Sequence, residues 1–277
     1  MTDNEIISGV LRAAGLELFA PIALTDCRVT KKYLLERAGI EKGTVYICAV
    51  PYLSRETVGE HNISAYAAVR DYHAYFAELW KRVTAELCRL FPENRFVGFA
   101  DHSPIDERDA ALKARLGVLG RNGMLITERY SSYVFLGELV TDAEVDCEAS
   151  DVKFCEDCGL CKQECPMDQL GECLSWVTQK KGELTETEQE ALVRYNTAWG
   201  CDVCQRVCPH TRRAIKNGTI YTNIDYFLTD VIPDLDPAIL SAMSDAEFSS
   251  RAFSWRGRQT VSRNLEILER ERSKKTN

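Results

Sequence analysis

The sequence has no uninterrupted apolar run of the roughly 20 residues that a helix needs to cross a bilayer. Its start, MTDNEIISGV, also lacks the basic and apolar regions of a secretory signal peptide. We therefore expect a cytoplasmic protein without membrane contact. Repeats and low-complexity segments are absent too, and 277 residues with 45% hydrophobic content suffice for about two ordinary globular domains.

The common nucleotide-binding signatures are also missing. No G-x-G-x-x-G follows a strand, and there is no G-x-x-x-x-G-K-[ST]. Gly117, Gly120 and Gly123 have a different spacing, which indicates a turn. Asp71-Tyr72-His73 begins like the D-x-H-x-x-G motif that supplies a histidine to cobalamin, but Phe76 stands at the glycine position. This motif is therefore incomplete.

Excess positive charge is lacking, because 34 Lys and Arg residues face 42 Asp and Glu residues and leave a net charge of −8. This argues against a protein that coats nucleic acid in general. The charge is uneven, however, since residues 203–224 and 251–277 are both basic. These two segments are either solvated surface or a face that binds phosphate groups, and the sequence leaves both interpretations open.

Cysteine, in contrast, is abundant, with 12 residues in a chain expected in a reducing compartment. Cys155, Cys158, Cys161 and Cys165-Pro166 form the run C-x2-C-x2-C-x3-C-P, which is typical of ferredoxins that hold [4Fe–4S] clusters. In two-cluster proteins, the fourth cysteine of this run ligates the other cluster. The run therefore predicts a second cluster.

A second, incomplete run supplies most of the remaining ligands: Cys201, Cys204 and Cys208-Pro209. Ala198 occupies its first position, so Cys173 is the nearest thiol that can complete the set. The predicted assignment is Cys155, Cys158, Cys161 and Cys208 on one cluster, and Cys165, Cys173, Cys201 and Cys204 on the other. A structural zinc site is the less favoured alternative, because it needs only four thiolates.

The pattern of apolar residues predicts an α+β protein in three parts: 1–148, 149–215 and 216–277. Capping boxes predict helices after Thr2, Thr185 and Ser244. Cys48 and Cys88 are expected to be small buried residues. The remaining predictions are strands at 44–50, 95–100, 124–127 and 132–140, helices at 69–90 and 106–116, and a basic helical C-terminal segment.

An ordered series of segments resembles the epoxyqueuosine reductase family over most of residues 60–210. The matching segments are Arg70–His73, Asp101–Pro104 with Glu107–Arg108, Gly117–Asn122, Tyr133–Glu138, the ferredoxin run, Cys173–Trp176 leading to Gly182, and Gly200–Gln205. Family members continue past the segment that matches Arg256-Gly257 into a helical-repeat region. We therefore expect a short form without that region, which weakens the expectation that tRNA is a partner.

The resemblance implies a nitroreductase-like cobalamin domain at 1–148, a ferredoxin-like domain with two [4Fe–4S] clusters at 149–215, and a helical basic segment at 216–277. It implies reduction of epoxyqueuosine to queuosine in tRNA, with cobalamin bound base-off and electrons from a donor such as ferredoxin or flavodoxin. Asp101 falls on the family's proton donor. The corrin-contacting positions fall on Ser64, Leu125, Thr127, Leu136, Trp176, Gln179, Cys201 and Asp202.

Physical chemistry agrees with the role that the resemblance implies for Asp101. Opening an epoxide to an alkene needs electrons and a proton for the departing oxygen, and a carboxylic acid donates at neutral pH only when its pKa is raised. Asp101 ends the apolar segment RFVGFA, where burial can meet that condition. The alternative role is an Asp that caps a turn or helix. His102 stands where the family usually has a small residue.

Two other functions remain open at this stage. One is a corrinoid reductase that acts on a small molecule, as reductive dehalogenases do. The other is a two-cluster electron-transfer protein without catalytic activity, in which residues 1–148 dock partners.

Overall fold

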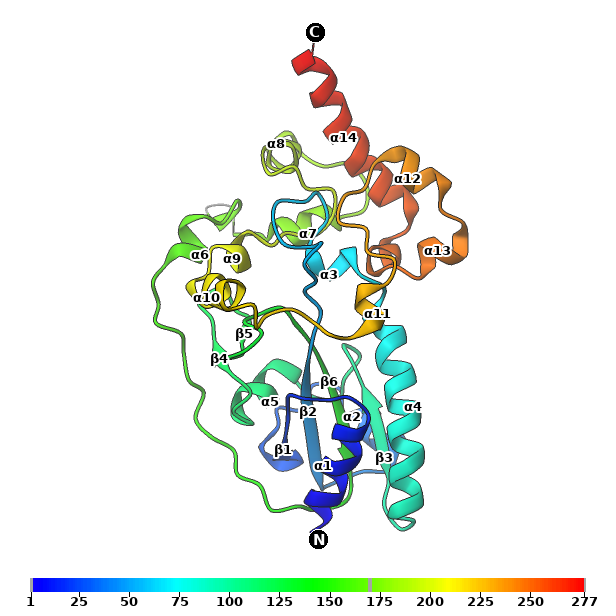
Figure 1. Cartoon of the computed structure of the whole chain (residues 1–277). Coiled ribbons are helices and arrows are strands. Elements are labelled where there is room, and N and C mark those ends of the chain that lie inside the picture. Colours follow the sequence, from blue (N-terminus) through cyan, green and yellow to red (C-terminus); the bar gives the residue numbers. More distant parts are fainter. Residues whose placement is uncertain (1, 169–170, 277) are drawn as a thin grey trace. The chain divides into compact units, whose positions relative to one another are not determined.

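The computed structural model describes residues 2–168 and 171–276, with side chains to residue 271 (Figure 1). The chain has mixed α and β structure and forms two compact units. The first unit comprises Met1–Pro51 and Tyr72–Asp157, and the second comprises Tyr52–Asp71 and Cys158–Asn277. The segment between residues 52 and 71 thus belongs to the second unit. The three-part division at residues 148 and 215 stays a prediction.

The first unit is built on a four-stranded antiparallel sheet with the order β1-β2-β6-β3. Its strands are β1 (Phe19–Ala23), β2 (Thr44–Pro51), β3 (Phe96–Phe99) and β6 (Val134–Thr141). All eight residues of β2 are buried. A central strand covered on both faces has no polar side to present, which explains why TVYICAV is a continuous apolar run.

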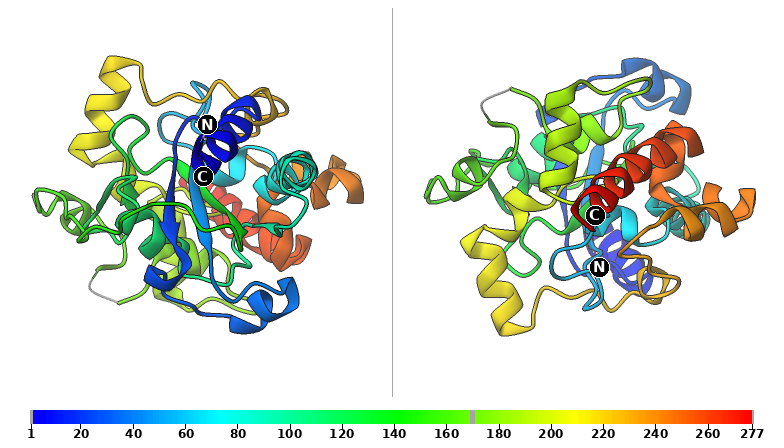
Figure 2. Two further views of the ribbon diagram at one scale, coloured as in Figure 1. Left: turned by 90° about the horizontal axis from the view of Figure 1, so that it is seen from below. Right: turned by 90° about the horizontal axis from the view of Figure 1, so that it is seen from above.

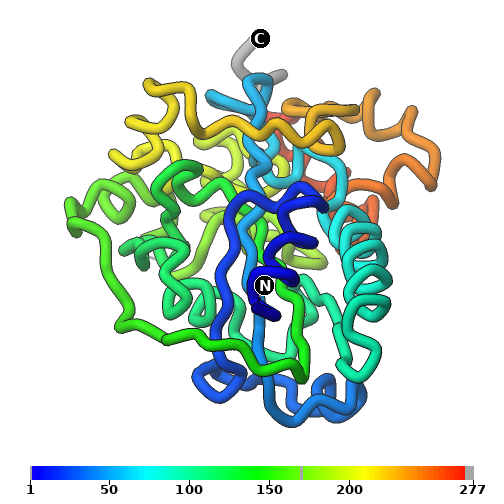
Figure 3. Tube along the Cα trace, turned by 60° about the horizontal axis from the view of Figure 1, so that its bottom comes forward, coloured from blue at the N-terminus to red at the C-terminus, as the bar shows by residue number. Residues whose placement is uncertain are grey.

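Helices cover both faces of this sheet. They are α1 (Asp3–Ala13), α2 (Lys32–Ala38), α4 (Tyr72–Leu90) and α5 (Glu107–Lys113), with the short 3-10 helix η1 (Leu24–Asp26) after β1. On one face, the Tyr46 hydroxyl of β2 donates to Asn4 of α1 at 3.0 Å, and α4 packs on β3 and β6; Figure 3 shows α1 in dark blue in front of the strands. On the other face, Ala110 and Ala111 of α5 join a buried apolar cluster with Ile47 and Val140.

Close packing between β6 and α4 leaves no space for a side chain at Gly137. A Cβ atom there would lie 2.4 Å from Cε1 of Phe76. We therefore expect Gly137→Ala to destabilise the protein by about 1–3 kcal/mol, because overpacking forces side chains and backbone to shift. Gly9→Ala in α1 is the control, since nothing lies within 4 Å of its Cβ position. Urea denaturation gives the free energy of unfolding of both variants. Equal values for Gly137→Ala and Gly9→Ala would contradict the prediction.

A hairpin and an extended segment complete the first unit. Strands β4 (Val118–Leu119) and β5 (Leu125–Ile126) pair antiparallel, and the Gly120 amide donates to the Met124 carbonyl at 2.8 Å. The glycine spacing therefore marks a turn, as predicted. Leu119 also pairs with Phe154, directly before Cys155.

The second unit is helical. Its elements are α3 (Ala65–Ala68), α6 (Leu160–Gln163), α7 (Leu174–Thr178), α8 (Glu186–Arg194), α9 (Val203–Arg206), α10 (Pro209–Asn217), α11 (Asp225–Leu228), α12 (Pro237–Ala242), α13 (Asp245–Ser249), η3 (Ala252–Arg256) and α14 (Arg258–Thr276). Helix α14 packs against α8 (Figure 2). The wholly buried Asn264 of α14 donates to the carbonyls of Thr178 and Ala198, each at 2.7 Å. A hydrogen-bonded amide thus fixes α14 in this apolar core.

Most predicted elements are confirmed, including the capping boxes at Thr2, Thr185 and Ser244. The long helix begins at Tyr72 instead of Val69, because the Asp71 amide donates to the Ser250 carbonyl at 2.9 Å within the second unit. The prediction for Cys88 is wrong, since this thiol on α4 is exposed. Among the described residues, no helix combines the length and apolar character needed to cross a membrane.

Candidate functional site

Asp101 lies in a tight, strained turn directly after β3. The His102 amide donates to the Ala100 carbonyl at 2.6 Å, so Asp101 is the central residue of a three-residue turn. Its φ of 58° lies in the left-handed region, which non-glycine residues rarely adopt. Strain of this kind concentrates at functional sites, where the surrounding structure holds the residue in place. The turn presents the Asp101 side chain, of which 54% is exposed.

Two side chains from the start of α4 bind the Asp101 carboxylate. The Tyr72 hydroxyl donates to Oδ2 of Asp101, and Nε2 of His73 lies 3.2 Å from the same oxygen. The ring of Phe135 stacks on Tyr72 with centroids 4.2 Å apart. Tyr72 and His73 belong to a segment that matched the family, yet the sequence assigned them no role.

The predicted rise in the pKa of Asp101 is wrong. Burial acts to raise the pKa of Asp101, but the hydrogen bonds from His73 and Tyr72 and the charges of His73 and Lys31 outweigh it, and the pKa lies below the ordinary value. Hydrogen bonds to a carboxylate favour its charged form. At neutral pH, free Asp101 is therefore a proton acceptor, and it must gain a proton before it can act as an acid.

Two further carboxyl groups lie near this turn, and sequence reasoning gave them no function. The Asp101 amide donates to Oε1 of Glu107, the first residue of α5, at 3.1 Å. Glu138 of β6 is wholly buried. Burial, and after it the negative charge of Glu107, raise the pKa of Glu138 well above the usual range of a carboxyl group. A charged residue inside the apolar strand SYVFLGELV is the signal that could have identified it.

His102 contacts the region before and within α2. Its Nε2 lies 2.9 Å from the Tyr33 hydroxyl and its Nδ1 lies 3.5 Å from Nζ of Lys31. Its ring is exposed. His102 is thus a polar surface residue beside the Asp101 turn.

The cysteines of the two runs lie on short helices and at helix ends. All 12 cysteines of the chain are free thiols. In the second unit, Cys161 lies on α6, Cys173 precedes α7, Cys204 lies on α9, and Cys208 is the N-cap of α10 with Pro209 as the first helical residue. Helix α6 packs against α9, which brings the two runs together. Cys155 is held in the first unit by its amide, which donates to the Leu119 carbonyl at 3.0 Å.

In the part of the chain that the structure describes, no three His, Cys, Asp or Glu side chains lie close enough together to bind a single metal ion. A [4Fe–4S] cluster makes a different demand, because each of its irons takes a separate thiolate. The ligand assignment of the eight cysteines, with Cys165 and Cys201 among them, stays a prediction.

Several predicted corrin-contacting residues of the second unit gather in one place. Ser64, Cys201 and Asp202 line a common hollow. The buried Ser64 hydroxyl interacts with the carboxylate of Asp202, and Oδ2 of Asp202 also accepts from the Ala65 amide at 2.6 Å. On α7, Trp176 is 51% exposed, and the Gln179 side chain follows it at the helix end.

The predicted corrin contacts of the first unit are apolar or already engaged. Leu125 is buried on β5, and Leu136 lies on β6, on the same face as Glu138. The Thr127 hydroxyl donates to the Ser131 carbonyl at 3.0 Å and accepts from the Tyr130 amide at 3.1 Å. Thr127 therefore shapes a turn, and its hydroxyl is occupied.

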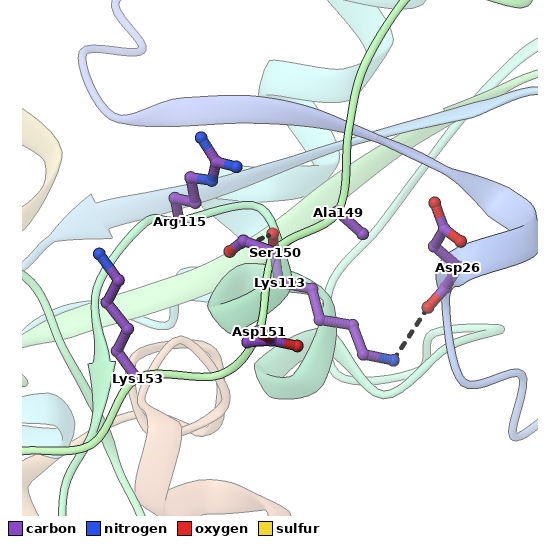
Figure 4. A pocket seen from close by; sticks show the side chains of 7 residues that line it. All are labelled: Asp26, Lys113, Arg115, Ala149, Ser150, Asp151 and Lys153. Carbon is purple, nitrogen blue, oxygen red and sulfur yellow. Dashed lines mark hydrogen bonds between the residues drawn. The ribbon is translucent and has the colours of Figure 1, made fainter.

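A separate charged hollow of about 760 Å³ lies in the first unit (Figure 4). Arg115 and Lys153 are unpaired within the described residues, while Lys113 binds Asp109 at 2.8 Å. Two carboxylates offset these cations, so the hollow lacks the positive excess that phosphate groups favour. Its lining consists of Asp26, Lys113, Arg115, Ala149, Ser150, Asp151 and Lys153.

The two basic segments differ in how their cations are used. Arg258 donates to the carbonyls of Leu240 and Met243, and Arg263 donates to the carbonyl of Lys180, so these arginines hold the second unit together. On α10, in contrast, three cations are exposed and have no partner among the described residues: Arg212, Arg213 and Lys216. Segment 203–224 therefore offers free positive charge, whereas much of the charge in 251–277 is structural.

Comparison with known proteins gives consistent results. No family model matches the chain. The epoxyqueuosine reductase of Listeria monocytogenes is 33% identical over 210 residues, which cover 72% of this chain and 54% of that protein. The epoxyqueuosine reductase of Synechocystis sp. is 30% identical over 200 residues, which cover 68% of this chain and 67% of that protein. The chain thus spans about half to two thirds of the length of these relatives.

Solved structures share the fold. Epoxyqueuosine reductase from Streptococcus thermophilus matches with a TM-score of 0.74 at 22% identity, covering 97% of this chain and 81% of that chain. An epoxyqueuosine reductase solved with an epoxyqueuosine-modified tRNA-Tyr stem loop matches with a TM-score of 0.75 at 21% identity, covering 96% and 80%. Because 30% identity also extends over two thirds of both this chain and the Synechocystis protein, the chain belongs to the epoxyqueuosine reductase family.

Proposed function

We propose that this protein reduces the epoxide of epoxyqueuosine in tRNA to the alkene of queuosine, with cobalamin and two [4Fe–4S] clusters as cofactors. The observation that carries the proposal is the strained Asp101 turn, whose carboxylate is held by Tyr72 and His73. A proton-exchanging group fixed in this way meets the main demand that epoxide opening makes on the protein. Family membership supplies the substrate.

The cysteine donor set fits two clusters. Thiolates are the usual ligands of [4Fe–4S] clusters, and the run from Cys155 to Pro166 has the spacing of two-cluster ferredoxins. Cys155, Cys158, Cys161 and Cys208 would hold one cluster, and Cys165, Cys173, Cys201 and Cys204 the other. A nitroreductase-like arrangement of the first unit and a ferredoxin-like arrangement of the cysteine segment are part of this proposal.

Cobalamin also fits residues of this chain. Ser64, Cys201 and Asp202 line one hollow with polar groups, and the exposed Trp176 offers an apolar ring. Leu125, Thr127, Leu136 and Gln179 complete the proposed set. When bound, cobalamin supplies the electrons that reduce the epoxide, and the clusters pass them on from an external donor such as ferredoxin or flavodoxin.

The protein's own contribution is acid–base chemistry and positioning. Asp101 delivers a proton to the departing oxygen, and Tyr72 and His73 stabilise the carboxylate that remains. Because these two contacts lower the pKa of Asp101, its protonated form exists only briefly at neutral pH and donates readily. The stacked Phe135 keeps the Tyr72 ring in the orientation that this hydrogen bond needs.

The free cations of α10 are the proposed binding groups for the tRNA backbone. We expect the double variant Arg212→Ala, Arg213→Ala to weaken binding of an anticodon stem loop. The slope of log affinity against log salt should fall by about 0.7–0.9 for each phosphate group that the variant no longer neutralises. Fluorescence anisotropy at several salt concentrations measures both effects. The double variant Arg115→Ala, Lys153→Ala at the charged hollow is the control, and equal weakening in the two proteins would contradict the assignment.

Mass spectrometry of tRNA nucleosides tests the reaction. The full chain, reconstituted anaerobically with iron, sulfide and cobalamin, is incubated with reduced methyl viologen and tRNA-Tyr that carries epoxyqueuosine. The expected product is queuosine, which has lost one oxygen atom. If protein with intact clusters and bound cobalamin leaves epoxyqueuosine unchanged, the proposal is wrong. Reduction of an organohalide by the same preparation would then favour a small-molecule reductase.

A further inference from the structure

The carboxyl groups of Glu107 and Glu138 form a buried pair behind the Asp101 turn. Glu138 lies opposite Ile47 of β2 and Phe99 of β3, on the sheet face that α5 covers. Its side chain is 0% exposed, and the hydroxyl of Ser103 is the hydrogen-bonding neighbour that favours its charged form. Glu138 also meets the carboxyl of Glu107, which raises the pKa of Glu138. Two carboxylates in contact repel, but an acid can donate to a carboxylate.

We propose that Glu107 and Glu138 share one proton and return it to Asp101 in each turnover. The inference rests on the proposed function, since it concerns the proton that this reaction consumes. Reducing an epoxide to an alkene takes up two electrons and two protons and releases water. The electrons come from the external one-electron donor. Asp101, a carboxylate at neutral pH, takes one proton from the pair and delivers it to the oxygen; the pair regains a proton from water, and water also supplies the second proton.

The position of Glu107 makes it the link in this arrangement. Its Oε1 accepts from the Asp101 amide at 3.1 Å, while its carboxyl also meets Glu138. Burial raises the pKa of Glu107 as well, so the pair holds its proton at pH values at which an exposed carboxyl group is ionised. The other titratable groups that interact with the pair are Asp101 after β3, Lys31 before α2, Cys48 on β2 and Cys27 after η1.

Infrared spectroscopy tests the shared proton without any activity measurement. We expect the unmodified chain at neutral pH to show the C=O stretching band of a protonated carboxyl group, and Glu138→Gln to lose it. Glu36→Gln is the control, because this glutamate of α2 is exposed and its ionic partner is Lys32. Absence of the band in the unmodified chain, or its survival in Glu138→Gln, would overturn the shared proton.

Stability against pH gives a second readout of the same proton. A pKa raised in the folded state contributes stability that is full below the unfolded pKa and is lost as pH rises through the folded pKa. The unmodified chain should therefore lose stability with rising pH relative to Glu138→Gln, in which no proton can dissociate. Parallel stability curves would contradict the raised pKa.

The pH profile of single-turnover epoxide reduction tests the return of the proton. The rate of the unmodified enzyme should stay constant with rising pH until the pair of Glu107 and Glu138 loses its shared proton. In Glu138→Gln the decline should begin at lower pH, with a loss of about tenfold or more at neutral pH and convergence in acid. Glu36→Gln should follow the unmodified enzyme. An unchanged profile in Glu138→Gln would mean that solvent recharges Asp101. If the unmodified chain reduces no epoxyqueuosine, the proposed function fails, while the infrared band still decides whether the pair holds a proton.

Discussion

Replacing Asp101 with Asn is expected to slow epoxide reduction by a factor of about 10²–10⁴, the range that a positioned acid contributes to catalysis. The amide keeps the size of the side chain and an oxygen that accepts a hydrogen bond from Tyr72 or His73. It cannot, however, exchange a proton with the epoxide oxygen. Asparagine also tolerates the left-handed φ of 58° at this position, so the turn should be retained.

Single-turnover kinetics and cobalamin titration separate the two properties of this variant. Asp101→Asn should bind cobalamin and carry the same iron content as the unmodified chain. Asp26→Asn, at an exposed aspartate of the same unit, is the matched control and should turn over normally. Full activity of Asp101→Asn would remove Asp101 from the mechanism. Loss of activity together with loss of cobalamin would instead assign it a binding role.

Cys161→Ser is expected to remove one cluster and, with it, all turnover. Four thiolates hold each [4Fe–4S] cluster, and serine is a poor substitute for a thiolate. Because electrons must pass along the clusters, one missing cluster interrupts the supply to the epoxide. Iron analysis after anaerobic reconstitution should show about four iron atoms per chain instead of about eight.

Cys88→Ser is the matched control for this experiment, because Cys88 is an exposed thiol on α4, outside both runs. It should keep its full iron content. The same analysis of Cys173→Ser decides whether this residue, at the N-cap of α7, is the eighth ligand. Full iron content in Cys161→Ser, or zinc in place of iron in the unmodified chain, would contradict the two-cluster proposal.

Local signals in the sequence predicted the secondary structure well. The capping boxes at Thr2, Thr185 and Ser244 each start a helix, because the hydrogen bonds that define them join residues three positions apart. The buried strand at 44–50 was predictable for a similar reason, since a continuous apolar run needs cover on both faces. The cysteine runs were identified in the same way, from residue types at short spacing, whereas Asp101 was identified through the resemblance to the family.

Other properties depend on contacts that short spacing cannot show. Cys88 was expected to be buried beside Leu87, but its place on α4 faces solvent. The cations at 251–277 looked like those at 203–224, yet Arg258 and Arg263 are engaged by carbonyls far away in the sequence. The sequence gives the charge of a residue directly, but the partners of that residue depend on which distant segments pack beside it.

The sequence by itself determined the family, and it predicted the cysteine chemistry and the position of the candidate acid. Only the tertiary structure decided the protonation of the site. It brings the start of α4 to the Asp101 turn, so that Tyr72 and His73 lower a pKa that burial alone would raise. It also sets Glu138 of β6 against Glu107 of α5 in an apolar core. The reason is physical: a pKa depends on the distances between charges and on exclusion of water, and both arise only when distant segments pack.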